Sequence, residues 1–127
     1  MSIKKIFFIF ITAFLLNTVW EHLHSLLYIH YKGGEITNFI LFRATLFDAV
    51  FITVLIFVMA NIKSLNKTWF LVSVSVATAI LIEIYALSTG RWAYGAMPVI
   101  PIINTGLTPT VQLAFLGYIT KRLNKIS

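Results

Sequence analysis

Residues 38–60 read NFILFRATLFDAVFITVLIFVMA, a nearly continuous apolar segment. A helix that crosses a membrane needs about 20 mostly apolar residues. This segment supplies them with only Arg43 and Asp48 as charged residues. On either side of it, three further apolar segments occupy residues 6–29, 68–87 and 99–120, with short polar connections between them. The sequence therefore predicts an all-α fold, an integral membrane four-helix bundle that forms a single transmembrane domain over residues 1–127.

The composition points the same way. Of the 127 residues, 59% are hydrophobic and 11% are charged, and the mean hydropathy is +0.90. Ordinary soluble domains carry about 25% charged residues, and a chain this short has too much surface to hide so many apolar side chains from water. These values argue against a soluble enzyme, a disordered chain and a nucleic-acid-binding protein. Because the chain has no cysteine, it offers neither a disulfide nor a metal–thiolate site.

The basic residues predict an orientation, because Lys and Arg collect in cytoplasmic loops. One side of a four-span protein would hold Lys4, Lys5, Lys63, Lys67, Lys121, Arg122 and Lys125. The other side would hold Lys32 and Arg91, with Glu35 offsetting one charge. We therefore expect both termini in the cytoplasm, and the net charge of +6 requires no nucleic-acid partner. Residues 4–16 are similar to a signal peptide, but no small-x-small cleavage site follows, so we expect an uncleaved first span.

Three of the four acidic residues lie inside predicted spans: Glu21, Asp48 and Glu83. A charge at the centre of a membrane helix costs about 2.5–3.5 kcal/mol and persists only where it faces a bundle interior or a wet cavity. At about 1.5 Å per residue, Glu21 and Glu83 both lie about 22 Å above the cytoplasmic side, and Asp48 lies about 15 Å below the outer side. The sequence thus predicts a polar pocket in the outer half of the membrane.

The three carboxyl groups are the candidate catalytic residues, because neighbouring buried carboxyl groups can act as general acid and base. Asn17, Glu21, His24 and Tyr28 share one face of the first span, which should face the bundle interior. Arg43 is expected to reach Glu21 or Glu83 across the bundle, or to extend to the interface. The candidate ligand-binding residues are Asn17, Trp20, His24, Arg43, Arg91, Trp92, Tyr94, Asn104 and Gln112. Trp92 and Tyr94 suit the outer headgroup level, and with Trp20 they could stabilise a positive charge.

The last span is the least regular. Residues 98–109 are rich in proline, glycine and hydroxyl side chains, which break or kink a helix. Non-helical backbone at membrane depth is tolerated only where protein buries it or water reaches it. We therefore expect the fourth helix to be broken, or preceded by a re-entrant segment, and residues 98–109 to form a wall of the pocket.

Several short motifs stand out along the chain: Trp20-Glu21, Asp48, Glu83, Gly90-x-Trp92-x-Tyr94-x-x-Met97-Pro98 and Gly106-Leu107-x-Pro109-x-x-Gln112. Together they resemble the motifs of a group of small bacterial multi-pass membrane proteins without a characterised function. The resemblance covers most of the chain. It implies the same four-helix topology and brings no activity, cofactor or substrate.

Two functions compete. The first is a protein with an outward-facing polar pocket that binds or chemically modifies a lipophilic small molecule by carboxylate acid–base chemistry. The alternative is a non-catalytic membrane subunit, or a small transporter component, whose polar residues serve helix packing. Besides the bilayer, a homo-oligomer or a larger membrane partner fits so small a chain. Glu21-x-x-His24 has the spacing of di-iron sites, which need a second such motif. The chain has none, so we predict no metal site and assign no cofactor.

Overall fold

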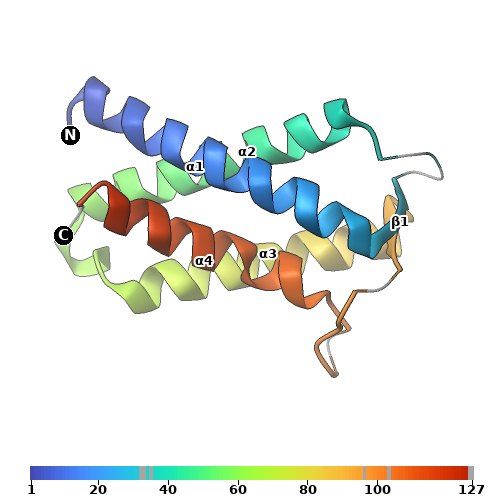
Figure 1. The fold of residues 1–127 in the computed structure, drawn as a ribbon. Coiled ribbons are helices and arrows are strands. Elements are labelled where there is room, and N and C mark those ends of the chain that lie inside the picture. The colour runs from blue at the N-terminus through green and yellow to red at the C-terminus, as the bar shows by residue number, and fades with distance from the viewer. Residues whose placement is uncertain (32–33, 35, 96, 103, 126–127) are drawn as a thin grey trace.

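Four helices lie lengthwise beside one another in the computed structural model, which describes residues 1–31, 34, 36–95, 97–102 and 104–125 (Figure 1). They are α1 (Ile3–His24), α2 (Asn38–Asn61), α3 (Thr68–Ser88) and α4 (Leu107–Leu123). In this part of the chain, α1 with its extension to Leu27, α2 and α3 are long and apolar enough to cross a membrane. The prediction of a helical fold is confirmed, and the three apolar helices are those of a membrane-embedded protein. Lys32 and Glu35 lie outside the described residues.

The helices pack in the order α2, α1, α4, α3. Close backbone contacts join α1 to α2, α1 to α4 and α3 to α4, whereas α2 and α3 have almost none. The core that joins them is built from small and aliphatic side chains, namely Ile9, Ala13, Ala49, Ile52, Ile56, Ala79, Leu113 and Leu116. Small residues let helix backbones approach closely where lipid supplies no hydrophobic driving force. The first and last helices of the chain are therefore neighbours.

Both termini and the 62–67 connection lie at one end of the bundle (Figure 1). Side chains tie the two terminal helices together there. The Nζ of Lys5 donates to the carbonyl oxygen of Asn124, and the Nδ2 of Asn124 donates to Thr12 Oγ1 at 3.2 Å. The segments that carry the seven basic residues of the predicted cytoplasmic side thus share this end of the molecule.

The first predicted span, residues 6–29, is displaced in the structure. The helix begins earlier, at Ile3, and ends at His24; a 3₁₀ turn, η1 (Ser25–Leu27), follows it. Strand β1 (Tyr28–Tyr31) then pairs antiparallel with β2 (Trp92–Tyr94), with Tyr28 opposite Tyr94. Aromatic and β-branched residues favour strands. The four residues of β1 directly follow a long apolar helix, and so short a pattern was not enough to predict a strand there. This ribbon lies across the end of the bundle opposite the termini (Figure 1).

The fourth predicted span, residues 99–120, is also corrected. Helix α4 begins only at Leu107, whose N–H donates to the carbonyl oxygen of Pro98 at 2.7 Å. Residues 98–106 form a loop instead, closed by a bridge between Val99 and Gly106; Ile103 lies outside the described residues. Pro109 does not break the helix, because it lies in the first turn, where a backbone N–H has no partner within the helix.

The backbone at Gly106 packs closely against the side chains of Met97 and Tyr94. A Cβ atom there would lie 2.7 Å from Met97 Cγ and 3.0 Å from Tyr94 Cζ. Gly117, inside α4, differs, because a Cβ atom there would meet Leu71 at an ordinary 3.7 Å. The junction between loop and α4 therefore requires glycine, whereas the middle of α4 does not.

We predict that Gly106→Ala lowers the free energy of unfolding by about 1–3 kcal/mol, the usual cost of overpacking. The matched control, Gly117→Ala, should leave stability unchanged or raise it by up to about 1 kcal/mol, because alanine is the better helix former. Unfolding in mixed micelles with increasing SDS measures both. Equal stability of the two variants would contradict the close packing at Gly106.

Candidate functional site

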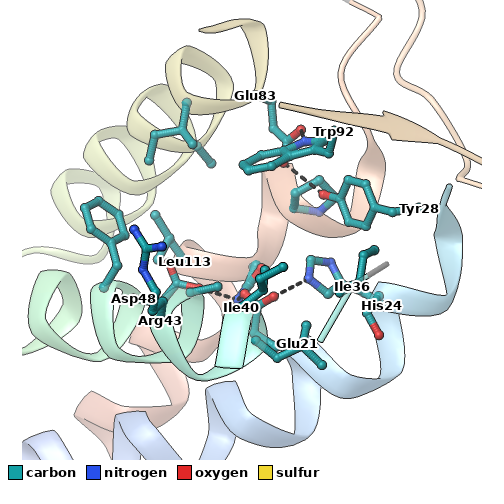
Figure 2. A pocket seen from close by; sticks show the side chains of 18 residues that line it. Glu21, His24, Tyr28, Ile36, Ile40, Arg43, Asp48, Glu83, Trp92 and Leu113 are labelled. Atoms are coloured by element: carbon teal, nitrogen blue, oxygen red, sulfur yellow. Dashed lines mark hydrogen bonds and ion pairs between the residues drawn. The ribbon is translucent and has the colours of Figure 1, made fainter. Parts of the chain in front are cut away.

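One cavity brings together the ionisable residues of three helices. Its volume is about 380 Å³. The polar residues that line it are Glu21, His24, Ser25, Tyr28, Arg43, Asp48, Glu83, Trp92 and Gln112. Most of the remaining lining is apolar: Ile36, Ile40, Leu41, Ala44, Phe47, Ala79, Ile82, Pro109 and Leu113. Pockets for small molecules have this size and this mixture of apolar walls with a few convergent polar groups. Figure 2 shows two polar groups on opposite sides, one around Glu21 and Asp48, the other around Glu83.

The first group, which we name the Gln112 cluster, consists of Asn17, Glu21, His24, Asp48 and Gln112. The Nε2 of Gln112 donates to Asn17 Oδ1 at 2.9 Å, to Glu21 Oε1 at 2.7 Å and to Asp48 Oδ2 at 2.6 Å. An amide nitrogen carries only two hydrogens, so the three acceptors share them. One side chain of α4 thereby connects α1 with α2 in the bundle interior.

The carboxyl groups within this cluster differ in exposure. Glu21 is buried and pairs with His24, whose Nε2 lies 2.7 Å from Glu21 Oε2. The spacing of three residues places the two side chains on one face of α1. Asp48 is only half-buried and faces the cavity. Both carboxyl groups accept a hydrogen bond from the same nitrogen, Gln112 Nε2. Asp48 is therefore the carboxyl group of this cluster that a bound molecule would meet.

The second group, the Glu83 cluster, consists of Tyr28, Glu83, Trp92 and Tyr94. Glu83 Oε1 accepts a hydrogen bond from the hydroxyl of Tyr28 at 3.0 Å. Its Oε2 accepts from Trp92 Nε1 at 2.9 Å and from the hydroxyl of Tyr94 at 2.7 Å. The ribbon supplies all three donors, so this carboxylate fastens β1 and β2 to α3. Three donors on one buried carboxylate keep it in place with little capacity left for a ligand.

Burial and the nearby Glu83 carboxylate raise the pKa values of the two ribbon tyrosines, Tyr28 and Tyr94. Loss of hydration first, and the nearby negative charge of Glu83 second, raise the pKa of Tyr28 far above its usual range. Burial and the hydrogen bond to Glu83 also raise the pKa of Tyr94, against a smaller lowering effect from the Gly106 N–H. Both hydroxyls therefore remain donors at any physiological pH, as the Glu83 cluster requires.

Other predicted ligand-binding residues lie away from the cavity. Trp20 packs on Phe115, with ring centroids 6.0 Å apart, and Asn104 is exposed in the loop before α4. Arg91 lies over the ring of Tyr85 at 5.3 Å. None of these three, nor Tyr94, lines the cavity in the part of the chain that the structure describes.

Arg43 lines the cavity without pairing with an acid. The only ion pair among the described residues joins His24 to Glu21, so the expected pairing of Arg43 with Glu21 or Glu83 is wrong. The Arg43 side chain is exposed, and its guanidinium lies 5.9 Å from the ring centre of Phe39, one turn earlier on α2. Arg43 and Asp48 project about 140° apart around α2. Because Asp48 points toward the bundle interior, Arg43 projects toward the exposed side of the helix.

The cavity wall also departs from the prediction. Of residues 98–109, only Pro109 is among the lining residues that the structure describes, so the expected wall is wrong except at this position. The loop turns back on itself through the Val99–Gly106 bridge instead. Tyr28 was expected on the polar face of the first span but was not predicted as a site residue; it lines the cavity from strand β1 instead. Sequence reasoning also missed the apolar lining, because aliphatic side chains that face a cavity look like those that face lipid.

No three His, Asp or Glu side chains of the described residues are arranged to hold a metal ion. The Glu21-x-x-His24 motif is engaged internally instead, because each side chain is the partner of the other. The second nitrogen of His24, Nδ1, lies 3.4 Å from Thr108 Oγ1.

No family model matches the chain, and no curated protein or solved structure is significantly similar to it. The interpretation of the site therefore rests on its geometry.

We predict that Gln112→Ala destabilises the protein by about 1–3 kcal/mol, because buried acceptors on α1 and α2 lose their donor. The matched control is Thr120→Ala on the same helix, where the buried hydroxyl bonds only the Leu116 carbonyl oxygen among the described residues. We expect this control to lose no more than about 1 kcal/mol. Denaturation in SDS mixed micelles measures the difference, and an equal loss in both variants would contradict the bridging role of Gln112.

The raised tyrosine pKa values also predict alkaline instability. The folded protein holds both hydroxyl protons while the unfolded chain releases them near pH 10, so their contribution to stability is complete below about pH 10 and falls as the pH rises further. The slope of unfolding free energy against pH above about pH 10 should be shallower in Tyr28→Phe and Tyr94→Phe than in the parent. Identical slopes would show that neither hydroxyl is held protonated by Glu83 and burial.

Proposed function

We propose that the chain is a multi-pass protein of the cell membrane, with four spans and both termini in the cytoplasm, that binds a lipophilic small molecule in this cavity. The orientation is supported by the clustering of basic segments at the end with the termini, since such residues face the cytoplasm. In this orientation the β1–β2 ribbon and the cavity belong to the outer half of the membrane.

The observation that carries the binding proposal is the arrangement of polar groups around an apolar space. Leu113, Ile40 and Ile82 form an apolar wall against which the apolar part of a ligand can pack. Asp48 and Gln112 present polar atoms at one side of the cavity. A site that served helix packing alone would bring its polar groups together and leave no space between them. Here about 380 Å³ separates the walls.

The Gln112 cluster also supplies a chemical capability. Glu21 and Asp48 both accept from the amide nitrogen of Gln112, and Asp48 faces the cavity. A carboxyl group in that position can give a proton to a bound molecule or take one from it, with Glu21 and His24 redistributing the charge. We propose Asp48 as the group that touches the bound molecule. Glu21 is a positioning residue, and Glu83 holds the ribbon.

A second candidate function is that of a non-catalytic membrane subunit. The observation that favours it is the Gln112 amide, which links α1, α2 and α4 through three hydrogen bonds. Such polar contacts between membrane helices are worth about 0.6–2 kcal/mol each, enough to serve packing alone.

Single substitutions of the carboxyl groups separate the two functions. We expect Asp48→Asn to fold like the parent and to lose a small molecule that co-purifies with it, because the carboxylate contacts that molecule. The control is Thr53→Ala on the same helix, where the hydroxyl bonds the Ala49 carbonyl oxygen and lies away from the cavity lining. Native mass spectrometry measures bound mass, and circular dichroism measures folding.

Glu21→Gln and Glu83→Gln complete the comparison. We expect Glu83→Gln to loosen the ribbon and lower stability by about 1–3 kcal/mol. If all three carboxyl variants lose stability equally and the parent carries no bound molecule, the packing function holds and the binding function is wrong.

A further inference from the structure

The cavity is open on one side, between α2 and α3. These two helices pack on each other near the 62–67 connection, where Leu55 and Met59 meet Leu71. Toward the other end the cavity separates them, with Ala44 on the α2 side and Ile82 on the α3 side. The pairs α1–α2, α1–α4 and α3–α4 are all closed by backbone contacts.

Exposure distinguishes the floor of the cavity from its mouth. Glu21 on α1 and Leu113 on α4 are 6% and 3% exposed, so these helices form the floor. Phe47 on α2 is 52% exposed while lining the same cavity, which places the mouth beside it. At the end of the bundle the ribbon contributes Tyr28 and Trp92, both fastened to Glu83 (Figure 2).

In the proposed orientation the mouth faces the membrane. Beside Phe47 on α2 lie the exposed side chains of Val50 and Val54, and α2 is one of the helices able to cross a bilayer. A molecule already dissolved in the outer leaflet can therefore reach Asp48 between two helices without passing through water. Such a molecule is an amphiphile, with an apolar tail beside the aliphatic lining and a head group at the Gln112 cluster.

The Gln112 cluster on the cavity floor has more hydrogen-bond acceptors than donors, and this indicates which head group it can bind. Three acceptor oxygens, two of them from carboxyl groups, share the two hydrogens of Gln112 Nε2. A head group that donates hydrogen bonds completes this cluster, whereas a carboxylate or phosphate adds further acceptors.

Charge favours a cationic donor. The ionisable groups that line the cavity around Asp48 are Glu21 and His24 from α1, Arg43 from its own helix, Glu83 from α3 and Tyr28 from β1. Glu21 is paired with His24, α4 contributes only neutral side chains to the lining, and Arg43 is exposed at the mouth. Excess negative charge in a low-dielectric space needs a proton or a cation, and the rings of Trp92 and Phe47 attract a cation as well.

We propose that the cavity takes an amphiphile with a primary ammonium head group from the membrane, sideways between α2 and α3, with the ammonium on Asp48. This inference rests on the proposed binding function and adds to it the ligand class and the access route.

A set of matched probes tests the ligand class. Brominated alkylamine, alcohol and carboxylate of one chain length are added to the full-length protein in nanodiscs, and quenching of Trp92 is recorded in a Trp20→Phe, Trp69→Phe background. The binding signal is the saturable part that the unbrominated compound of the same head group displaces. We expect the amine to bind most tightly and Asp48→Asn to weaken it about tenfold or more.

Two variants, Asp48→Asn and Arg43→Gln, change the charge at the site and test the preference for an ammonium group. Asp48→Asn adds a donor to a cluster that lacks one, so we expect it to fold. Arg43→Gln removes a repelling charge from the mouth and should strengthen amine binding a few-fold. Tightest binding of the carboxylate, with loss in Arg43→Gln, would overturn the ammonium assignment in favour of an anionic amphiphile. Equal binding of alcohol and amine, or no saturable binding of any probe, would overturn it too.

A crosslink across the mouth tests the access route. The chain has no cysteine, so Ala44→Cys and Ile82→Cys together place one thiol on each side of the opening. Joining them with a cleavable bis-maleimide should abolish the saturable amine signal, and cleavage of the linker should restore it. Each single-cysteine variant, alkylated alone, is the control for added bulk.

The outcomes separate this inference from the function beneath it. Saturable amine binding that persists in the crosslinked protein would overturn sideways access while leaving a binding site. Loss of a co-purified molecule in Asp48→Asn, without amine binding, would leave the proposed function standing and remove the ammonium assignment. A parent protein that carries no molecule and binds no probe removes both.

Discussion

The Nε2 atom of Gln112 lies within hydrogen-bonding distance of one oxygen each from Asn17, Glu21 and Asp48. An unpaired polar side chain is costly at membrane depth, because hydrocarbon offers no alternative partner. The position of α4 is therefore fixed by acceptors on α1 and α2, and the bundle order α2, α1, α4, α3 follows from it. The cavity between α2 and α3 is the space that this order leaves open.

The buried carboxylate of Glu83 also has hydrogen-bond partners, but they come from a different part of the fold. Its donors come from a short ribbon outside the spanning helices, and their aromatic rings stack edge to face, with the centroids of Tyr28 and Trp92 5.8 Å apart. A carboxylate held by three donors is a structural anchor, whereas Asp48 keeps an open side. Two acids at comparable predicted depth thus have different roles because their neighbours differ.

Apolar length and the positions of charges were enough to predict the helices and the convergence of acids from three spans. A helix rises regularly by about 1.5 Å per residue, so counting along the spans was enough to expect Glu21, Asp48 and Glu83 near one another, and they line one cavity. The ribbon and the late start of α4 were not predictable, since they depend on Tyr28 and Tyr94 finding Glu83 across the fold. The lack of an acidic partner for Arg43 was not predictable, because a count of depth contains no information about which way a side chain points.

The adjacency of the first and last helices has a consequence for biogenesis. Glu21 is made 91 residues before its partner Gln112, and chains elongate at about 5–20 residues per second, so Glu21 waits for roughly 5–20 s. During that interval α1 holds an acid, an amide and a histidine with no α4 to receive them. The Glu21–His24 contact, which is local to α1, is available at once and gives the acid a hydrogen-bond partner until α4 arrives. The motif with the spacing of a metal site thus supplies α1 with a polar partner of its own before the bundle is complete.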